Sequence, residues 1–193
     1  MKKKGHTETS TLEVIFSGVG GQGLMLAGKL LGAAAVSHEG KNAVMTSAYG
    51  VESRGSFAKS DVIISDEEID YPEVLKADIV IALAPVAYEK YVSSLGEDTV
   101  LMYDSAIERA ESKARQIGFP AEKIAAEAGS SSMVNIVALG ALVKLTGAVS
   151  EQSIESAVSE EFHGKKELAL LNLKALHLGL KAMAKVDPSC IVR

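Results

Sequence analysis

The chain has 193 residues, of which 47% are hydrophobic, so it is long enough to bury a full core. A formal net charge of −5 and a pI near 5.4 disfavour a nucleic-acid-binding surface, which needs an excess of Lys and Arg on one face. No apolar run is long enough to cross a membrane. The single cysteine, Cys190, permits neither an internal disulfide nor an iron–sulfur cluster held by this chain alone, which favours a reducing cytoplasm.

Residues 1–11 are predicted to be a solvated tail. Lys2, Lys3 and Lys4 are followed by threonines and a serine rather than by the apolar core of a signal peptide. One folded domain is therefore expected over residues 12–193. The four histidines are not spaced as metal ligands from one another or from Cys190, so no metal site is expected.

A glycine-rich turn joins the first expected strand to the first expected helix. An apolar run from Leu12 to Phe16 predicts the strand, and apolar residues at helical spacing predict a helix over residues 24–38, ended by Gly40. Four glycines lie between them, in residues 17–23. Such a turn leaves the first N–H groups of the helix unpaired and suits an anion, most often a phosphate.

Strands and helices then alternate as far as the middle of the chain. Further strands are predicted at residues 42–46, 57–64, 78–84, 99–103 and 117–119, with helices at 71–75 and 85–93. Residues 47–56 break all periodicity while carrying an aromatic, an acid and an Arg between glycines, which is typical of a binding loop.

The second half of the chain is predicted to be helical. Helices are expected over residues 120–128 and 133–145, and from Glu151 with Ser150 as its N-cap. The apolar pattern of residues 166–184 predicts a last helix covered on two sides. Asn172 lies opposite the polar stripe of that helix, so it should be buried and hydrogen-bonded.

This order of elements predicts an α/β fold: a three-layer Rossmann-like domain with a mostly parallel sheet and a helical C-terminal part. Ligands of such sheets bind outside the carboxyl ends of the strands. The glycine turn, the loop at residues 49–55, and Asp104 with Ser105 should all lie at that edge.

Two phosphate-binding motifs match the glycine turn only in part. Gly18, Gly20 and Gly23 fit the dinucleotide fingerprint G-x-G-x-x-G, but no acid stands at the end of the second strand to hold a ribose, which disfavours an NAD-linked dehydrogenase. A P-loop is excluded because Leu30 stands where the magnesium-binding hydroxyl should be, and core-type residues occupy the cradle.

Other residues have both a functional and a structural interpretation. Gln22, at the start of the helix, can bind a ligand or fix the neighbouring loop, and the glycines can serve helix packing alone. For Asn135 and Asn172, internal hydrogen bonding is the favoured reading. No Ser, Cys or Lys stands beside an evident general base, so no catalytic residue is predicted.

Taken together, several segments resemble the gamma subunits of 2-oxoacid:ferredoxin oxidoreductases, the family of the pyruvate, 2-oxoisovalerate and 2-oxoglutarate enzymes. The resemblance covers nearly the whole chain. Val51 and Ser56 depart from the usual loop, which reads YGPE followed by RGG. The segments are GVGGQG at 18–23, YGVESRG at 49–55, IISD at 63–66, NIVALG at 135–140, and Asn172 with Ala175 and Gly179.

The resemblance implies one subunit of an enzyme that oxidatively decarboxylates a 2-oxoacid, forms an acyl-coenzyme A and reduces ferredoxin. It implies alpha, beta and ferredoxin-like delta partner subunits, which would hold thiamine diphosphate, magnesium and the iron–sulfur clusters, and a role for this chain beside coenzyme A. Cofactor-binding residues carried over on these motifs are Gly18, Gly20, Gly21, Gln22, Gly23, Tyr49, Gly50, Glu52, Arg54, Gly55 and Asn135.

Three alternatives are weighed from the sequence. The chain could be a stand-alone nucleotide- or acyl-CoA-binding module or the small subunit of an arylpyruvate (indolepyruvate) ferredoxin oxidoreductase, and an NAD-linked dehydrogenase is the third, disfavoured alternative. In isolation the chain could form a homodimer. The sequence does not name the oxoacid.

Overall fold

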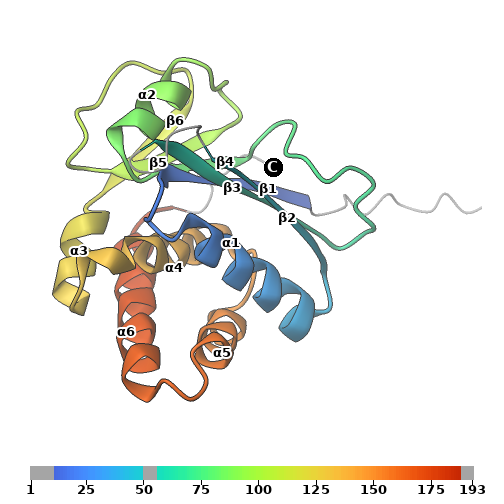
Figure 1. The fold of residues 1–193 in the computed structure, drawn as a ribbon. Coiled ribbons are helices and arrows are strands. Elements are labelled where there is room, and N and C mark those ends of the chain that lie inside the picture. The colour runs from blue at the N-terminus through green and yellow to red at the C-terminus, as the bar shows by residue number, and fades with distance from the viewer. Residues whose placement is uncertain (1–10, 50–55, 188–193) are drawn as a thin grey trace, which may run out of the picture.

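The computed structural model describes residues 11–49 and 56–187, which form a six-stranded sheet with helices on both faces (Figure 1). The strand order is β2-β3-β1-β4-β5-β6. β4 and β5 pair parallel with their neighbours, whereas β3 runs antiparallel to both β1 and β2. The strands are β1 (Thr11–Val19), β2 (Asn42–Tyr49), β3 (Phe57–Ser65), β4 (Ile79–Ala82), β5 (Val100–Asp104) and β6 (Arg115–Phe119).

Helix α2 (Pro85–Val92) covers one face of the sheet, and the remaining helices cover the other (Figure 1). Successive β1 residues supply both cores, because side chains alternate along a strand: Val14 and Phe16 join the large core, and Ile15 joins the α2 core. The other helices are α1 (Leu24–Ala33) with the π-turn η1 (Ala34–His38), α3 (Ala121–Ala128), the 3-10 turn η2 (Ser131–Met133), α4 (Val134–Thr146), α5 (Glu151–Glu161) and α6 (Lys166–Met183).

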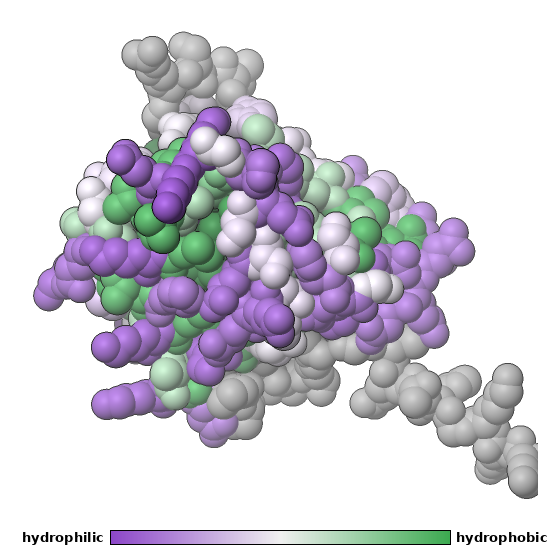
Figure 2. All heavy atoms as spheres, turned by 90° about the horizontal axis from the view of Figure 1, so that it is seen from below, coloured by the Kyte–Doolittle hydropathy of each residue, from purple (hydrophilic) through white to green (hydrophobic). Residues whose placement is uncertain are grey.

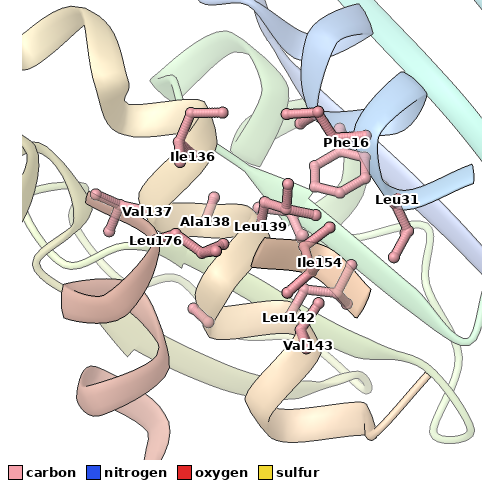
Figure 3. Packing of buried hydrophobic residues seen from close by; sticks show 14 of the residues in the cluster. Phe16, Leu31, Ile136, Val137, Ala138, Leu139, Leu142, Val143, Ile154 and Leu176 are labelled. Carbon is pink, nitrogen blue, oxygen red and sulfur yellow. The ribbon is translucent and has the colours of Figure 1, made fainter. Parts of the chain in front are cut away.

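Helix α4 is the centre of the larger core. Its Leu139 and Leu142 lie near Phe16 of β1 and Leu31 of α1 (Figure 3). On its other side α4 crosses α6 so closely that a Cβ built on Gly179 would lie 2.1 Å from the carbonyl oxygen of Val137. Helix α4 therefore fixes α6 to the layer that carries the glycine turn.

The predicted fold class is confirmed: helix, sheet and helix form three layers, five of the six strands run one way, and the C-terminal part is helical. Gly40 ends the first helix with φ 67°, and the Ser150 side chain accepts the N–H of Ser153 as predicted for an N-cap. Asn172 is buried and donates to the Leu168 carbonyl at 2.8 Å.

One sequence prediction is wrong, and another is wrong in part. Residues 71–75 form no helix, because the Glu13 carboxylate binds the N–H groups of Leu75 and Lys76 in an irregular segment, and Leu75 is 76% exposed. The cover predicted on two sides of helix α6 is missing in its first turns, where Leu168, Leu170 and Leu171 are 37%, 59% and 38% exposed. Figure 2 shows hydrophobic residues gathered on this lower face of the molecule. Further along the helix, Leu173, Ala175, Leu176 and Leu178 from both predicted faces pack against the core.

Candidate functional site

The glycine turn lies at the carboxyl end of β1, where the chain enters α1. Gly23 is the N-cap with φ 72°, and Gly21 has φ 98°; both angles favour glycine. Within the described residues, the N–H groups of Gly23, Leu24 and Met25 make no hydrogen bond. At the positive end of a ten-residue helix, the turn therefore presents donors that no described residue uses.

Gln22 fixes the turn to the next strand of the sheet. Its Oε1 accepts the N–H of Val19 at 2.9 Å, and its Nε2 donates to the carbonyl oxygen of Leu83 at 3.0 Å. Gly18 makes room for this side chain, because a Cβ at that position would lie 2.1 Å from Oε1. Of the two roles the sequence allows for Gln22, the structure shows the loop-fixing one.

The bond from Gln22 to Leu83 crosses the switch point of the sheet. From β1 the chain passes through α1 to β2, toward one edge of the sheet. From β4 it passes through α2, on the opposite face of the sheet, to β5, toward the other edge (Figure 1). A dinucleotide normally enters the crevice between two such strands. Here the Gln22 amide spans it, which agrees with the missing ribose-binding acid.

Asn135 supports the turn from below. It lies at the start of α4, is 3% exposed, and its Nδ2 donates to the Gly23 carbonyl at 2.9 Å. A Cβ on Gly23 would lie 2.5 Å from that nitrogen. Asn135 therefore positions the turn from within the core.

A cavity of about 260 Å³ opens beside the turn, toward β2 and β3 rather than toward β4. Tyr49 contributes to its wall, and its hydroxyl contacts the Met25 sulfur. The described lining residues include one cation, Lys59, and no carboxylate. They are Val19, Gly20, Gly21, Gly23, Leu24, Met25, Tyr49, Ala58 and Lys59.

Lys59 is anchored by a buried partner. Its Nζ pairs with Asp61, which is 5% exposed and whose Oδ1 has no hydrogen-bond partner among the described residues. Burial, together with the Asp61 charge, raises the pKa of Tyr91 to about 12. Lys59 and Asp61 both belong to β3. The one sequence signal that could have indicated Lys59 as a cavity residue is that it is a cation inside an apolar strand.

The structure brings only part of the predicted edge together. The cavity beside the turn is lined by four of the predicted residues, Gly20, Gly21, Gly23 and Tyr49. Asp104 lies two strands away from β1, and its carboxylate accepts the N–H groups of Ala106 and Glu122, so it serves the start of α3. Gly50, Glu52, Arg54 and Gly55 lie outside the described residues.

The sequence of residues 13–182 matches the family model described as pyruvate ferredoxin/flavodoxin oxidoreductase. The chain belongs to this family. A 2-oxoglutarate synthase subunit, KorC, from Methanocaldococcus jannaschii is 42% identical over 82% of this chain and 88% of its own length. Three further KorC subunits, from Archaeoglobus fulgidus and two Methanothermobacter species, are 34%, 37% and 39% identical.

Solved structures of the family have the same fold. The gamma subunit of a keto/oxoacid ferredoxin oxidoreductase from Geobacter sulfurreducens is 38% identical, with a TM-score of 0.78 over 90% of this chain and 96% of that one. A 2-oxoglutarate:ferredoxin oxidoreductase from Magnetococcus marinus, solved with 2-oxoglutarate, coenzyme A and succinyl-CoA bound, is 29% identical with a TM-score of 0.83. It matches 93% of this chain but only 32% of its own, longer chain.

The resemblance seen in the sequence is confirmed, and the chain is a subunit of a multi-subunit oxidoreductase of this family. Over the described residues no group of three or more His, Cys, Asp or Glu side chains is arranged to hold a metal ion. In the same part of the chain, no helix is long and apolar enough to span a membrane.

Proposed function

We propose that this chain is the gamma subunit of a 2-oxoglutarate:ferredoxin oxidoreductase, with residues 12–193 as one domain. Support for the identity of the oxoacid comes from the KorC subunits. The KorC subunit of Methanocaldococcus jannaschii is 42% identical to this chain, whereas ketoisovalerate and pyruvate oxidoreductase subunits are 30% to 34% identical. The complex decarboxylates 2-oxoglutarate, transfers the acyl group to coenzyme A and passes electrons to ferredoxin. Thiamine diphosphate with magnesium and the iron–sulfur clusters belong to alpha, beta and delta subunits, and the assembly works in the cytoplasm.

The contribution we assign to this chain is to bind an anionic part of coenzyme A in the cavity beside the glycine turn. The observation that carries this proposal is that the N–H groups of Gly23, Leu24 and Met25, in the cavity wall, find no partner among the described residues. Amide donors at a helix N-terminus stabilise phosphate oxygens. Among the described lining residues Lys59, already paired with Asp61, is the one cation, and none is a carboxylate.

The open glycines fit such a ligand. Among the described residues, a Cβ on Gly20 or Gly21 would meet nothing within 4 Å, so this part of the chain does not crowd the backbone at these positions. A phosphate can therefore approach the main chain closely. Coenzyme A supplies the thiol that accepts the acyl group, and this chain's residues hold and orient its charged end. Asn135 and Gln22 keep the donors in place.

The test is a Gly20→Val substitution in the reconstituted complex. Gly20 has an ordinary φ and free space around its Cβ position, so valine should be accepted by the fold while narrowing the cavity mouth. We expect the KM for coenzyme A and its dissociation constant by calorimetry to rise at least about tenfold, or about 1.4 kcal/mol. Gly96→Val is the matched control, because that glycine is equally open and lies outside the cavity.

Separate results would overturn separate parts of the proposal. Unchanged coenzyme A binding in Gly20→Val would remove the ligand assignment. Turnover of pyruvate or an arylpyruvate in preference to 2-oxoglutarate would remove the substrate assignment. A chain that binds acyl-CoA alone and never joins partner subunits would instead be a stand-alone binding module.

A further inference from the structure

Strand β2 forms one edge of the sheet. Among the described strands it pairs with β3 alone, in eight consecutive register pairs from Asn42 opposite Ser65 to Tyr49 opposite Ala58. No bulge interrupts this register. The strand is eight residues long, or about 26 Å, and no described strand pairs with the backbone groups on its outer side. These groups form a template for another strand.

The edge lacks the features that normally prevent pairing. Edge strands of monomeric proteins are protected by charged side chains, prolines or bulges, yet β2 reads NAVMTSAY and has none of these. The opposite edge is different: β6 has five residues, begins with Arg115, and its Gln116 is hydrogen-bonded to Ala110 in the preceding loop. Within the described residues, one edge of the sheet is thus protected and the other is open.

Large apolar side chains lie exposed beside the open edge. Met45 and Tyr49 of β2 are 40% and 60% exposed. On the neighbouring helix, Met25 of α1 and Val36 of η1 are 42% and 50% exposed. An apolar surface next to an unpaired strand indicates an interface that continues beyond the strand itself.

We propose that β2 pairs antiparallel with β2 of a second copy of this chain, across a two-fold axis, and joins two six-stranded sheets into one. The charge pattern fits a second copy of this chain as the partner. Identical surfaces bring like charges together, so self-pairing needs a nearly neutral patch. β2 is uncharged, and the cations beside it are compensated within the chain: Lys29 by Glu161 at 2.6 Å and Lys41 by Glu39 at 3.5 Å.

The first test measures the mass of the isolated chain by sedimentation between about 1 and 100 µM, since dimers respond to concentration. The wild type should be a dimer. Ser47→Lys, at an exposed position of β2, places two cations near the axis and should weaken the dimer at least tenfold. Ala126→Lys adds the same charge at an exposed position of α3 and should leave it unchanged. A wild-type monomer, or equal dimerisation of both variants, would overturn the proposal.

The second test locates the axis with single cysteines in a Cys190→Ser background. In a symmetric antiparallel pair, the distance between a residue and its own copy grows by about 6.6 Å for each step from the axis. Oxidation should therefore cross-link one or two adjacent positions between Val44 and Ser47 and no others, since a disulfide needs Cα atoms within about 7 Å. Even cross-linking along β2, or cross-linking to a different chain only, would contradict the two-fold pairing. Neither test uses coenzyme A, so failure here leaves the proposed function standing.

Discussion

The bond between Gln22 and the neighbouring strand makes a specific prediction about Gly18. Gln22→Ala removes two hydrogen bonds, to the Val19 N–H and the Leu83 carbonyl, and should cost about 2 kcal/mol of unfolding free energy at about 1 kcal/mol each. Gly18→Ala should cost about as much, because its new Cβ would displace the same side-chain amide. The other neighbours of that Cβ lie at 3.3 Å or more.

The double substitution separates this mechanism from a general cost of changing a glycine. With Gln22 already truncated, the clash at position 18 is gone. Alanine at position 18 then stabilises the protein by about 0.5 kcal/mol, because it restricts the unfolded chain more than glycine does. The double variant should therefore cost about 1.5 to 2 kcal/mol rather than the additive 4 kcal/mol, a coupling of about 2 kcal/mol.

Urea unfolding of the four proteins measures this coupling. Gly20→Ala serves as the control, since a Cβ there meets nothing within 4 Å, and its stability should stay within about 0.5 kcal/mol of the wild type. Additive costs at Gly18 and Gln22 would refute the argument that Gly18 exists to admit the Gln22 side chain.

Two further predictions concern parts of the fold away from the cavity. Gly179→Ala should lower the unfolding free energy in urea by about 2 kcal/mol or more, because its Cβ would lie 2.1 Å from the backbone oxygen of Val137 and helices α4 and α6 would have to separate. Gly96→Ala is the control and should be neutral. Equal effects of the two substitutions would show that the α4–α6 crossing is not tight. Burial alone would raise the pKa of Glu39. Hydrogen bonds from Ser150 and Ser153 and the charge of Lys41 instead hold this pKa below its ordinary value of 4.5. The ionised Glu39 side chain therefore stabilises the fold above pH 4.5, and this stabilisation is lost as the pH falls through the folded-state pKa. Glu39→Gln should lower the unfolding free energy by about 1 kcal/mol at pH 7 and by progressively less below pH 4.5. A difference in unfolding free energy that does not depend on pH would contradict this.

Local signals in the sequence were sufficient to predict most elements. Strand runs such as residues 79–82 are continuously apolar because both faces are covered, and the caps at Gly40 and Ser150 are set by residues close in the chain. Residues 71–75 failed because the pattern cannot reveal that Glu13, more than sixty residues earlier, binds the backbone there. Strand direction was equally hidden: the apolar run of β3 is the same whether it pairs parallel or antiparallel.

Of the candidate site, the sequence identified the glycines, Tyr49 and the two supporting amides Gln22 and Asn135, but neither the partner strand of Gln22 nor Lys59. The Gln22 amide reaches Leu83, which lies 61 residues further along the chain, and no local pattern names that partner. Lys59 enters the cavity wall because the antiparallel β3 returns alongside the turn. Its place follows from topology, which periodicity does not encode.

The glycines of the turn divide into two groups with different causes. Gly18 and Gly23 are required by the chain itself, since a Cβ would collide with Gln22 or Asn135. A Cβ on Gly20 or Gly21 meets no neighbour among residues 11–49 and 56–187, and Gly20 has no unusual φ, so neither packing within these residues nor backbone strain explains a glycine at position 20. A residue kept small without an internal reason, in a wall of unpaired N–H groups, is what an external ligand would require. Gly20 is therefore the position at which packing and ligand binding make opposite predictions, and a side chain there should leave stability intact while it weakens coenzyme A binding.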